Sequence, residues 1–153
     1  MNIRIYVMEI LSSIIQGWRI RSAKFKGYVN IHPSAILESN LLLDKVFPQG
    51  IYIGENSLIA AGSTILTHEH VKRVKDNPRM PYTVNTYIGR NCFIGIKAII
   101  LPGVRIGDEV IVGAGTVVTK DIPSNSVVVG NPGRVLDRKV NLSAKAVLGE
   151  FNY

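Results

Sequence analysis

IGRNCF IGIKAI ILPGVR IGDEVI VGAGTV VTKDIP, residues 88–123, repeats every six residues, and this stretch decides the fold. A β-branched residue opens every block, in the order Ile88, Ile94, Ile100, Ile106, Val112 and Val118. Four places further along stands a second column of small or medium side chains: Cys92, Ala98, Val104, Val110, Thr116 and Ile122. A period of six fits neither the 3.6 of an α-helix nor the 2 of a flat strand, but it is typical of a parallel β-helix.

Each hexapeptide is therefore expected to form one short strand and one turn, with successive coils stacking their leading residues into a continuous apolar column. The glycines that follow the leading residues are expected to supply the backbone conformation of tight corners. The same period is clear at Ile53, Ile59 and Ile65, and fainter at Ile31, Leu37 and Leu43. A chance coincidence of Ile and Val in an ordinary β-sandwich would not coordinate two columns in this way.

The period breaks once, in ILTHEHVKRVKDNPRMPYTVNT (65–86). The distance from Ile65 to Ile88 is not a multiple of six, so residues 67–86 are expected to leave the coil as an excursion loop. We divide the chain into an N-terminal helical segment (1–28), a hexapeptide-repeat β-helix (29–136) and a C-terminal tail (137–153). The predicted class is all-β.

Composition narrows the classes of function. Apolar residues make up 46% of the 153 residues but aromatics only 7%, which favours a core of branched aliphatic side chains. The net charge of +7 suits phosphate-bearing ligands, nucleic acid or an anionic membrane. The bases are scattered and not interleaved with aromatics, which argues against nucleic acid. A single cysteine, Cys92, excludes an internal disulfide, and we predict a cytoplasmic location.

The N-terminal segment has apolar residues at helical spacing followed by bases. The apolar positions are Ile3, Val7, Ile10, Leu11, Ile14 and Trp18, and the bases are Arg19, Arg21, Lys24 and Lys26. This pattern predicts an amphipathic helix. We favour a cap over the open end of the β-helix, with peripheral attachment to the inner face of an anionic membrane as the alternative. The tail NLSAKAVLGEF is expected to form a short closing helix.

The motifs LPGVRIGD, VGAGTVVTKDIP and VVVGNP, together with the repeat, resemble the bacterial hexapeptide-repeat acyltransferases. The resemblance covers about residues 31–136 and is strongest to sugar and polysaccharide O-acetyltransferases related to maltose and galactoside acetyltransferase. It implies a left-handed β-helix, a homotrimer, and acetyl-CoA between neighbouring subunits. The implied activity is transfer of acetyl to a hydroxyl of a sugar or glycan, in surface polysaccharide biosynthesis.

Such a transfer needs a base for the hydroxyl proton, and imidazole suits neutral pH. His32 precedes a proline in NIHPSA and is read as a turn residue, which leaves His68 and His70. Considered without the surrounding repeat, the two histidines would be interpreted as part of a solvated, positively charged loop surface. By its place in the resembled family, counted from Ile53, His70 is the preferred base, with His68 as its rival or orienting partner.

The resemblance also implies the residues that contact CoA and the acceptor. Ala114 would lie along the pantetheine arm, with Ile96 offering only its backbone. Thr119 and Lys120 would lie near the phosphate end, and Arg134 would reach the nucleotide phosphates. Asn40 falls where relatives carry an asparagine that contacts the acceptor. Cys92 is read as packed core, and the histidine spacing does not fit a metal site.

Rival interpretations share the fold. The enzymatic ones are N-acetylation of a nucleotide-linked amino sugar and O-acetylation of serine, although the long helical domain of the serine enzymes is missing. A third is a trimeric β-helix scaffold without catalysis. The transferred acyl group is expected to be either acetyl or succinyl.

Overall fold

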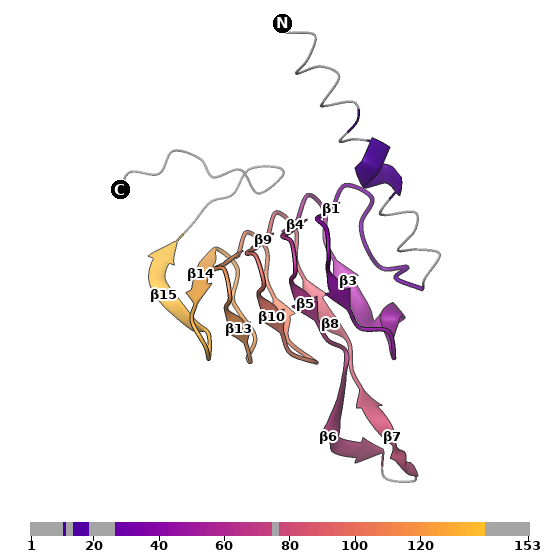
Figure 1. The fold of residues 1–153 in the computed structure, drawn as a ribbon. Helices are drawn as coiled ribbons and strands as arrows, with labels where there is room; N and C mark the ends of the chain where they lie inside the picture. Colours follow the sequence, from indigo (N-terminus) through magenta and orange to yellow (C-terminus); the bar gives the residue numbers. More distant parts are fainter. Residues whose placement is uncertain (1–10, 12–13, 19–26, 75–76, 140–153) are drawn as a thin grey trace, which may run out of the picture.

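The structure of the protein is a computed structural model that describes residues 11, 14–18, 27–74 and 77–139. Figure 1 shows a column of stacked coils from which one hairpin projects. Each full coil contributes one strand to each of three sheets, so the column has three flat faces. The coils wind left-handed. The predicted left-handed parallel β-helix is thus confirmed.

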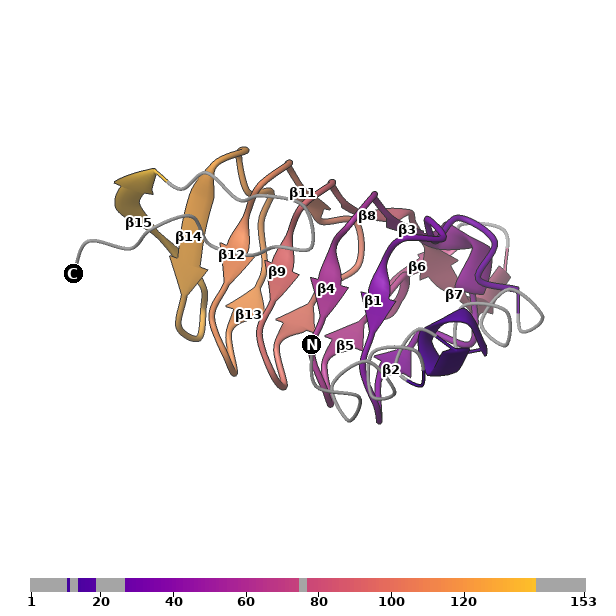
Figure 2. The ribbon, with the colours of Figure 1, turned by 90° about the horizontal axis from the view of Figure 1, so that it is seen from above.

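The first face is a six-stranded sheet whose strands lie side by side in Figure 2. Its order is β1 (Ile36–Leu37), β4 (Leu58–Ile59), β9 (Phe93–Ile94), β12 (Ile111–Val112), β14 (Ser126–Val129) and β15 (Arg134–Lys139). The second face is four-stranded: β13 (Val117–Val118), β10 (Ile99–Ile100), β5 (Thr64–Ile65) and β2 (Leu42–Leu43). The third is three-stranded: β11 (Arg105–Ile106), β8 (Thr86–Ile88) and β3 (Ile51–Ile53). Within the described residues, only β14 with β15, and β6 (His68–Val74) with β7 (Asn77–Thr83), pair antiparallel.

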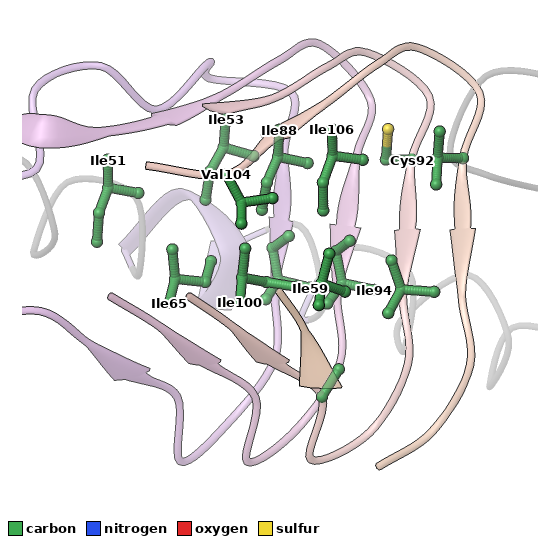
Figure 3. Close-up of a cluster of buried hydrophobic side chains, with 14 of the residues drawn as sticks. Ile51, Ile53, Ile59, Ile65, Ile88, Cys92, Ile94, Ile100, Val104 and Ile106 are labelled. Carbon is green, nitrogen blue, oxygen red and sulfur yellow. The ribbon is translucent and has the colours of Figure 1, made fainter. Parts of the chain in front are cut away.

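The registers place leading residue upon leading residue, as the period predicts. Ile59 pairs with Ile94, Ile94 with Val112, and Val112 with Val128. Figure 3 shows Ile59, Ile94 and Cys92 pointing into the column. The other members Ala98, Val110 and Thr116 of the second column are also fully buried. A fully buried Ile or Val contributes about 1.5–3 kcal/mol relative to an exposed one. The core is therefore a single apolar column along the axis.

The glycines after the leading residues are required for a different reason from the one expected. Gly89 and Gly95 do not have positive φ. A Cβ on Gly95 would instead lie 2.6 Å from the backbone N of Ala114, in the next coil. The left-handed corners are made by other residues, namely Asn40, Asn56, Asn91, Lys97, Glu109, Asn125, Gly62, Gly103 and Gly115. The glycines after the leading residues therefore allow coils to approach, and asparagine supplies many of the corners.

Two insertions interrupt the coils, both where the chain passes from the four-stranded to the three-stranded sheet. We call this turn the site corner. It comprises residues 44–50, 66–85, 101–104 and 119–121. Its first insertion contains a short 3-10 helix, η1 (Pro48–Gly50). The second is the β6–β7 hairpin, so the described part of the predicted excursion forms a two-stranded antiparallel ribbon. We call the turn from the six-stranded to the four-stranded sheet the far corner. It comprises residues 38–41, 60–63, 95–98 and 113–116.

Both ends of the column are in contact with additional chain. At the C-terminal end β15 folds back on β14. At the N-terminal end residues 11 and 14–18 are helical, which confirms an N-terminal helix. The Gln16 side-chain oxygen accepts a hydrogen bond from the N–H of Leu37, on the edge strand β1 (3.2 Å). The predictions for residues 1–10, 19–26 and 140–153 lie outside the described residues. Among the described helices, none is long and apolar enough to span a bilayer.

Candidate active site

Asp44 is a buried carboxylate at the site corner, directly after β2. Its Oδ2 accepts hydrogen bonds from the N–H groups of Thr67 (2.8 Å) and His68 (3.1 Å), and its Oδ1 accepts one from Val46 (2.8 Å). Burial by itself would raise the pKa of Asp44, but the N–H groups of Thr67 and Val46 and the His68 ring hold the pKa below its ordinary value. The carboxylate is therefore fixed in place and ionised at neutral pH.

His68 opens strand β6 one coil further along and turns its ring back onto Asp44. Its Nδ1 lies 2.5 Å from Asp44 Oδ2, and its side chain is 21% exposed. An ionised carboxylate only accepts hydrogen bonds, so Nδ1 carries a proton, and in the neutral ring Nε2 is the nitrogen with the free lone pair. This arrangement of imidazole and carboxylate suits a general base.

Two buried threonines fix the base of the hairpin that carries His68. Thr67 donates its hydroxyl proton to the carbonyl of Phe47 (2.8 Å), and Thr86 donates to the carbonyl of Leu66 (2.6 Å). The Thr86 hydroxyl also accepts the N–H of Gly103 (3.1 Å), in the following coil. The N–H of Val84 closes the hairpin onto the carbonyl of Thr67 (2.8 Å). The histidine thus stands on a rigid base even though it begins an excursion.

His70 and His32 have different surroundings. His70 is exposed, and its ring meets the His68 ring edge to face with centroids 5.2 Å apart. His32 lies in a turn where its Nδ1 accepts the N–H of Ser34 (3.2 Å), as expected of a structural residue. Of the two predicted bases, His68 has a buried carboxylate partner, and no such partner of His70 is found among the described residues. The geometry therefore favours the rival, His68, over the preferred His70.

The other predicted site residues are distributed over both corners. Thr119 and Lys120 are exposed at the site corner, two coils beyond His68, a rise of about 10 Å along the axis. Ile96 and Ala114 are exposed at the far corner in successive coils, linked by the bond from the N–H of Gly115 to the carbonyl of Ile96 (2.8 Å). Arg134 begins β15 and is exposed.

Asn40 is not brought to the histidines. It has φ 57° at the far corner, the opposite end of the four-stranded sheet from His68. No cluster of three His, Cys, Asp or Glu side chains able to hold a metal ion occurs among the described residues.

Known proteins match this chain in its hexapeptide-repeat region. Residues 86–120 match the family model "Hexapeptide repeat of succinyl-transferase". Galactoside O-acetyltransferase of Escherichia coli K12 is 40% identical over 114 residues, 73% of this chain and 55% of that protein. The crystal structure of a maltose O-acetyltransferase from Clostridium difficile 630 is 34% identical with a TM-score of 0.57, over 70% of this chain and 67% of that one. The chain belongs to the hexapeptide-repeat acetyltransferases.

A second solved member of this family is similar over the same region. The hexapeptide-repeat acetyltransferase of Vibrio cholerae O1 biovar eltor, solved with acetyl coenzyme A, has a TM-score of 0.63 and 26% identity over 72% of this chain and 60% of that one. The chain spans a little over half the length of the curated relatives it matches. The resemblance inferred from the sequence motifs is thereby confirmed.

Sequence reasoning missed Asp44. Its neighbourhood, ESNLLLDKVFPQG, looks irregular because the first insertion falls there. A signal was nevertheless present: Asp44 directly follows the leading residue Leu43, which pairs with Ile65. In that stacking the carboxylate lies one coil before the start of the excursion. An acidic side chain beside the leading column, on the coil next to two histidines, could have indicated the pair.

Proposed function

We propose that the protein is an acetyl-CoA-dependent O-acetyltransferase that acetylates a hydroxyl of a sugar or glycan, with His68 as general base. The observation that carries this proposal is the pairing of His68 Nδ1 with the buried Asp44 carboxylate. A scaffold would gain little from a buried ionised side chain, since desolvating it costs free energy. The rival scaffold interpretation has no use for this pair.

In the proposed reaction the acceptor hydroxyl oxygen attacks the thioester carbonyl carbon while His68 Nε2 takes the hydroxyl proton. The tetrahedral intermediate then expels the CoA sulfur, which receives that proton from the imidazolium. Asp44 keeps the ring in the tautomer with Nε2 unprotonated and stabilises the transient positive charge. Transfer is direct, with no acyl group on the protein.

The donor is proposed to lie along the coils between the corners. CoA is polyanionic, and Lys120 and Arg134 are exposed bases that can pair with its phosphates. The exposed backbone at Ile96 and Ala114 offers hydrogen-bonding groups for the pantetheine amides. The Vibrio cholerae relative, solved with acetyl coenzyme A, supports acetyl as the acyl group.

Self-association into a homotrimer is part of the proposal. The outer side of the six-stranded sheet carries a row of half-buried apolar side chains, Ile36, Leu58, Phe93, Ile111 and Val127, one per strand. The hairpin adds exposed Val71 (91%) and Met80 (53%). Contiguous apolar surface of this kind marks protein interfaces. A neighbouring subunit would complete the wall of the acceptor site.

The experiment follows thioester consumption by purified protein with acetyl-CoA or succinyl-CoA and a panel of sugars, glycans, amino sugars and serine. His68→Ala is expected to lower kcat about 10²- to 10⁴-fold with CoA binding retained, and His70→Ala to have a much smaller effect. The accepted compound separates the O-acetylation of sugars from the serine and amino-sugar rivals. Absence of turnover with every acceptor, together with absence of CoA binding by calorimetry, contradicts the enzyme proposal.

A role in surface polysaccharide biosynthesis is proposed with the activity. It requires that a glycan fragment be accepted better than a free monosaccharide. The same panel decides this point, because it compares kcat/KM for the two kinds of acceptor.

A further inference from the structure

The described part of the N-terminal helix exposes its apolar side chains. Leu11, Ile14, Ile15 and Trp18 are 48%, 62%, 48% and 70% exposed. Their spacing of three, four and seven residues places them in one stripe along the helix. We call these four residues the apolar stripe. A stripe of this kind normally packs against the protein's own core, and here it does not.

The helix instead turns a polar side chain towards the β-helix. Gln16 bonds the N–H of Leu37 on the edge strand β1. At 100° per residue, Gln16 lies about 150° around the helix from the centre of the apolar stripe. The helix therefore caps the strand edge with its polar side, and its apolar side faces away from the coils. Capping alone does not account for the amphipathic pattern, and a second contact surface is needed.

The charge next to the apolar stripe identifies the partner's chemistry. The eight residues that follow Trp18, RIRSAKFK, contain four bases and no acid, and the whole chain carries +7. A second copy of the chain would bring the same positive charge to this face. An anionic bilayer offers the complementary charge together with an apolar interior. Trp18 is also the type of residue that concentrates at the boundary between headgroups and acyl chains.

We infer that the N-terminal helix docks the protein peripherally on an anionic membrane surface, with the apolar stripe at the boundary between headgroups and acyl chains. The four bases of the sequence 19–26 add the positive charge that an anionic surface attracts. Figure 1 shows the helix above the N-terminal coils and the β6–β7 hairpin below them, on the opposite side. Docking through the apolar stripe thus leaves the site corner uncovered. The inference does not depend on the proposed reaction.

The test uses vesicles of phosphatidylcholine with one third phosphatidylglycerol, compared with phosphatidylcholine alone. Trp18 is the only tryptophan in the chain, so its fluorescence reports on the apolar stripe. We expect a blue shift of its emission with anionic vesicles and at least tenfold weaker binding to neutral ones. Each base removed from residues 19–26, as in Arg21→Gln or Lys24→Gln, is expected to weaken anionic binding about fivefold.

The matched variants are Ile14→Ser/Ile15→Ser, which keeps Trp18, and Leu42→Ser/Val46→Ser, which removes two exposed apolar side chains of the β-helix. The first is expected to lose at least tenfold in vesicle co-sedimentation and the second to match the wild type. Equal binding to neutral vesicles, no binding at all, or equal losses in both variants would overturn the inference. So would a Trp18 emission that is already blue-shifted without lipid and reverts when the oligomer dissociates, since a second copy would then cover the apolar stripe.

Discussion

The coils of residues 88–118 and the coils of residues 31–65 stack in register, but they differ at the site corner. In the later coils Leu101 leads to Ile106 without interruption, and the interior is lined by Ile, Val, Ala, Cys92 and one threonine, Thr116. In the earlier coils two insertions depart from the same corner, and Asp44 and Thr67 are buried beside them. The regular coils supply apolar burial, whereas the interrupted coils carry the polar contacts that fix a histidine. Stability and chemistry are thus placed in different parts of one column.

The sharpest test of this division removes the charge of Asp44. Asp44→Asn is expected to lower kcat about 10²- to 10⁴-fold, because a neutral amide cannot stabilise the imidazolium of His68. Steady-state kinetics with the accepted acceptor measure it. The matched control is Asp121→Asn, since Asp121 also lies at the site corner and accepts a backbone N–H, that of Arg105 (2.8 Å). Equal losses in the two variants would contradict a specific role of Asp44.

The regular coils are tested by truncating their core. Ile94→Ala removes a side chain with 0% exposure and is expected to lower the free energy of unfolding by about 2–5 kcal/mol. Leu42→Ala, at 56% exposure, is expected to change it by less than about 0.5 kcal/mol. Urea unfolding followed by circular dichroism gives both values. Similar costs at the two sites would show that the interior column does not dominate stability.

The reactivity of the Cys92 thiol tests whether solvent reaches the interior of the regular coils. Burial raises the pKa of its thiol from 9.0 to about 11. Only the thiolate reacts with disulfide reagents. A pKa raised by about two units lowers the thiolate fraction at neutral pH about a hundredfold. Ellman's reagent should thus label the native protein at least about a hundredfold more slowly than the protein in guanidinium. Rapid labelling of the native state would mean that the column opens readily.

The smallest effect concerns the pH dependence of stability at the interrupted coils. The pKa of Asp44 is lower in the folded protein than its ordinary value of 3.8, so the unfolded chain takes up the proton first as the pH falls. The stabilisation is therefore complete above the unfolded pKa and is lost as the pH falls through the folded pKa. At pH 7 the free energy of unfolding of the wild type is expected to exceed that of Asp44→Asn by about 1–3 kcal/mol. Urea midpoints that differ equally at pH 7 and in acid would disprove this linkage.

The period predicted the column because each leading residue is buried by its neighbours six and roughly eighteen residues away. Ile94 and Val112 could be placed in one stack from the sequence alone, and the structure pairs them. Asp44 could not be placed as easily, since its contact with His68 spans 24 residues and crosses an insertion. The role of the glycines was misjudged for a related reason: a corner conformation is a local property, but the clearance that Gly95 gives to Ala114 exists only after the coils stack.

The site corner also has a consequence for how such a chain can diversify. Ten residues separate Leu43 from Ile53 and 23 separate Ile65 from Ile88, where six would continue the period. The strands on either side of both insertions keep their register. Doubling the length of a loop between fixed ends costs only about 0.6 kcal/mol in closure entropy. The corner can therefore accept segments of very different length, and a new acceptor preference could arise there by insertion or deletion alone while the scaffold is inherited unchanged.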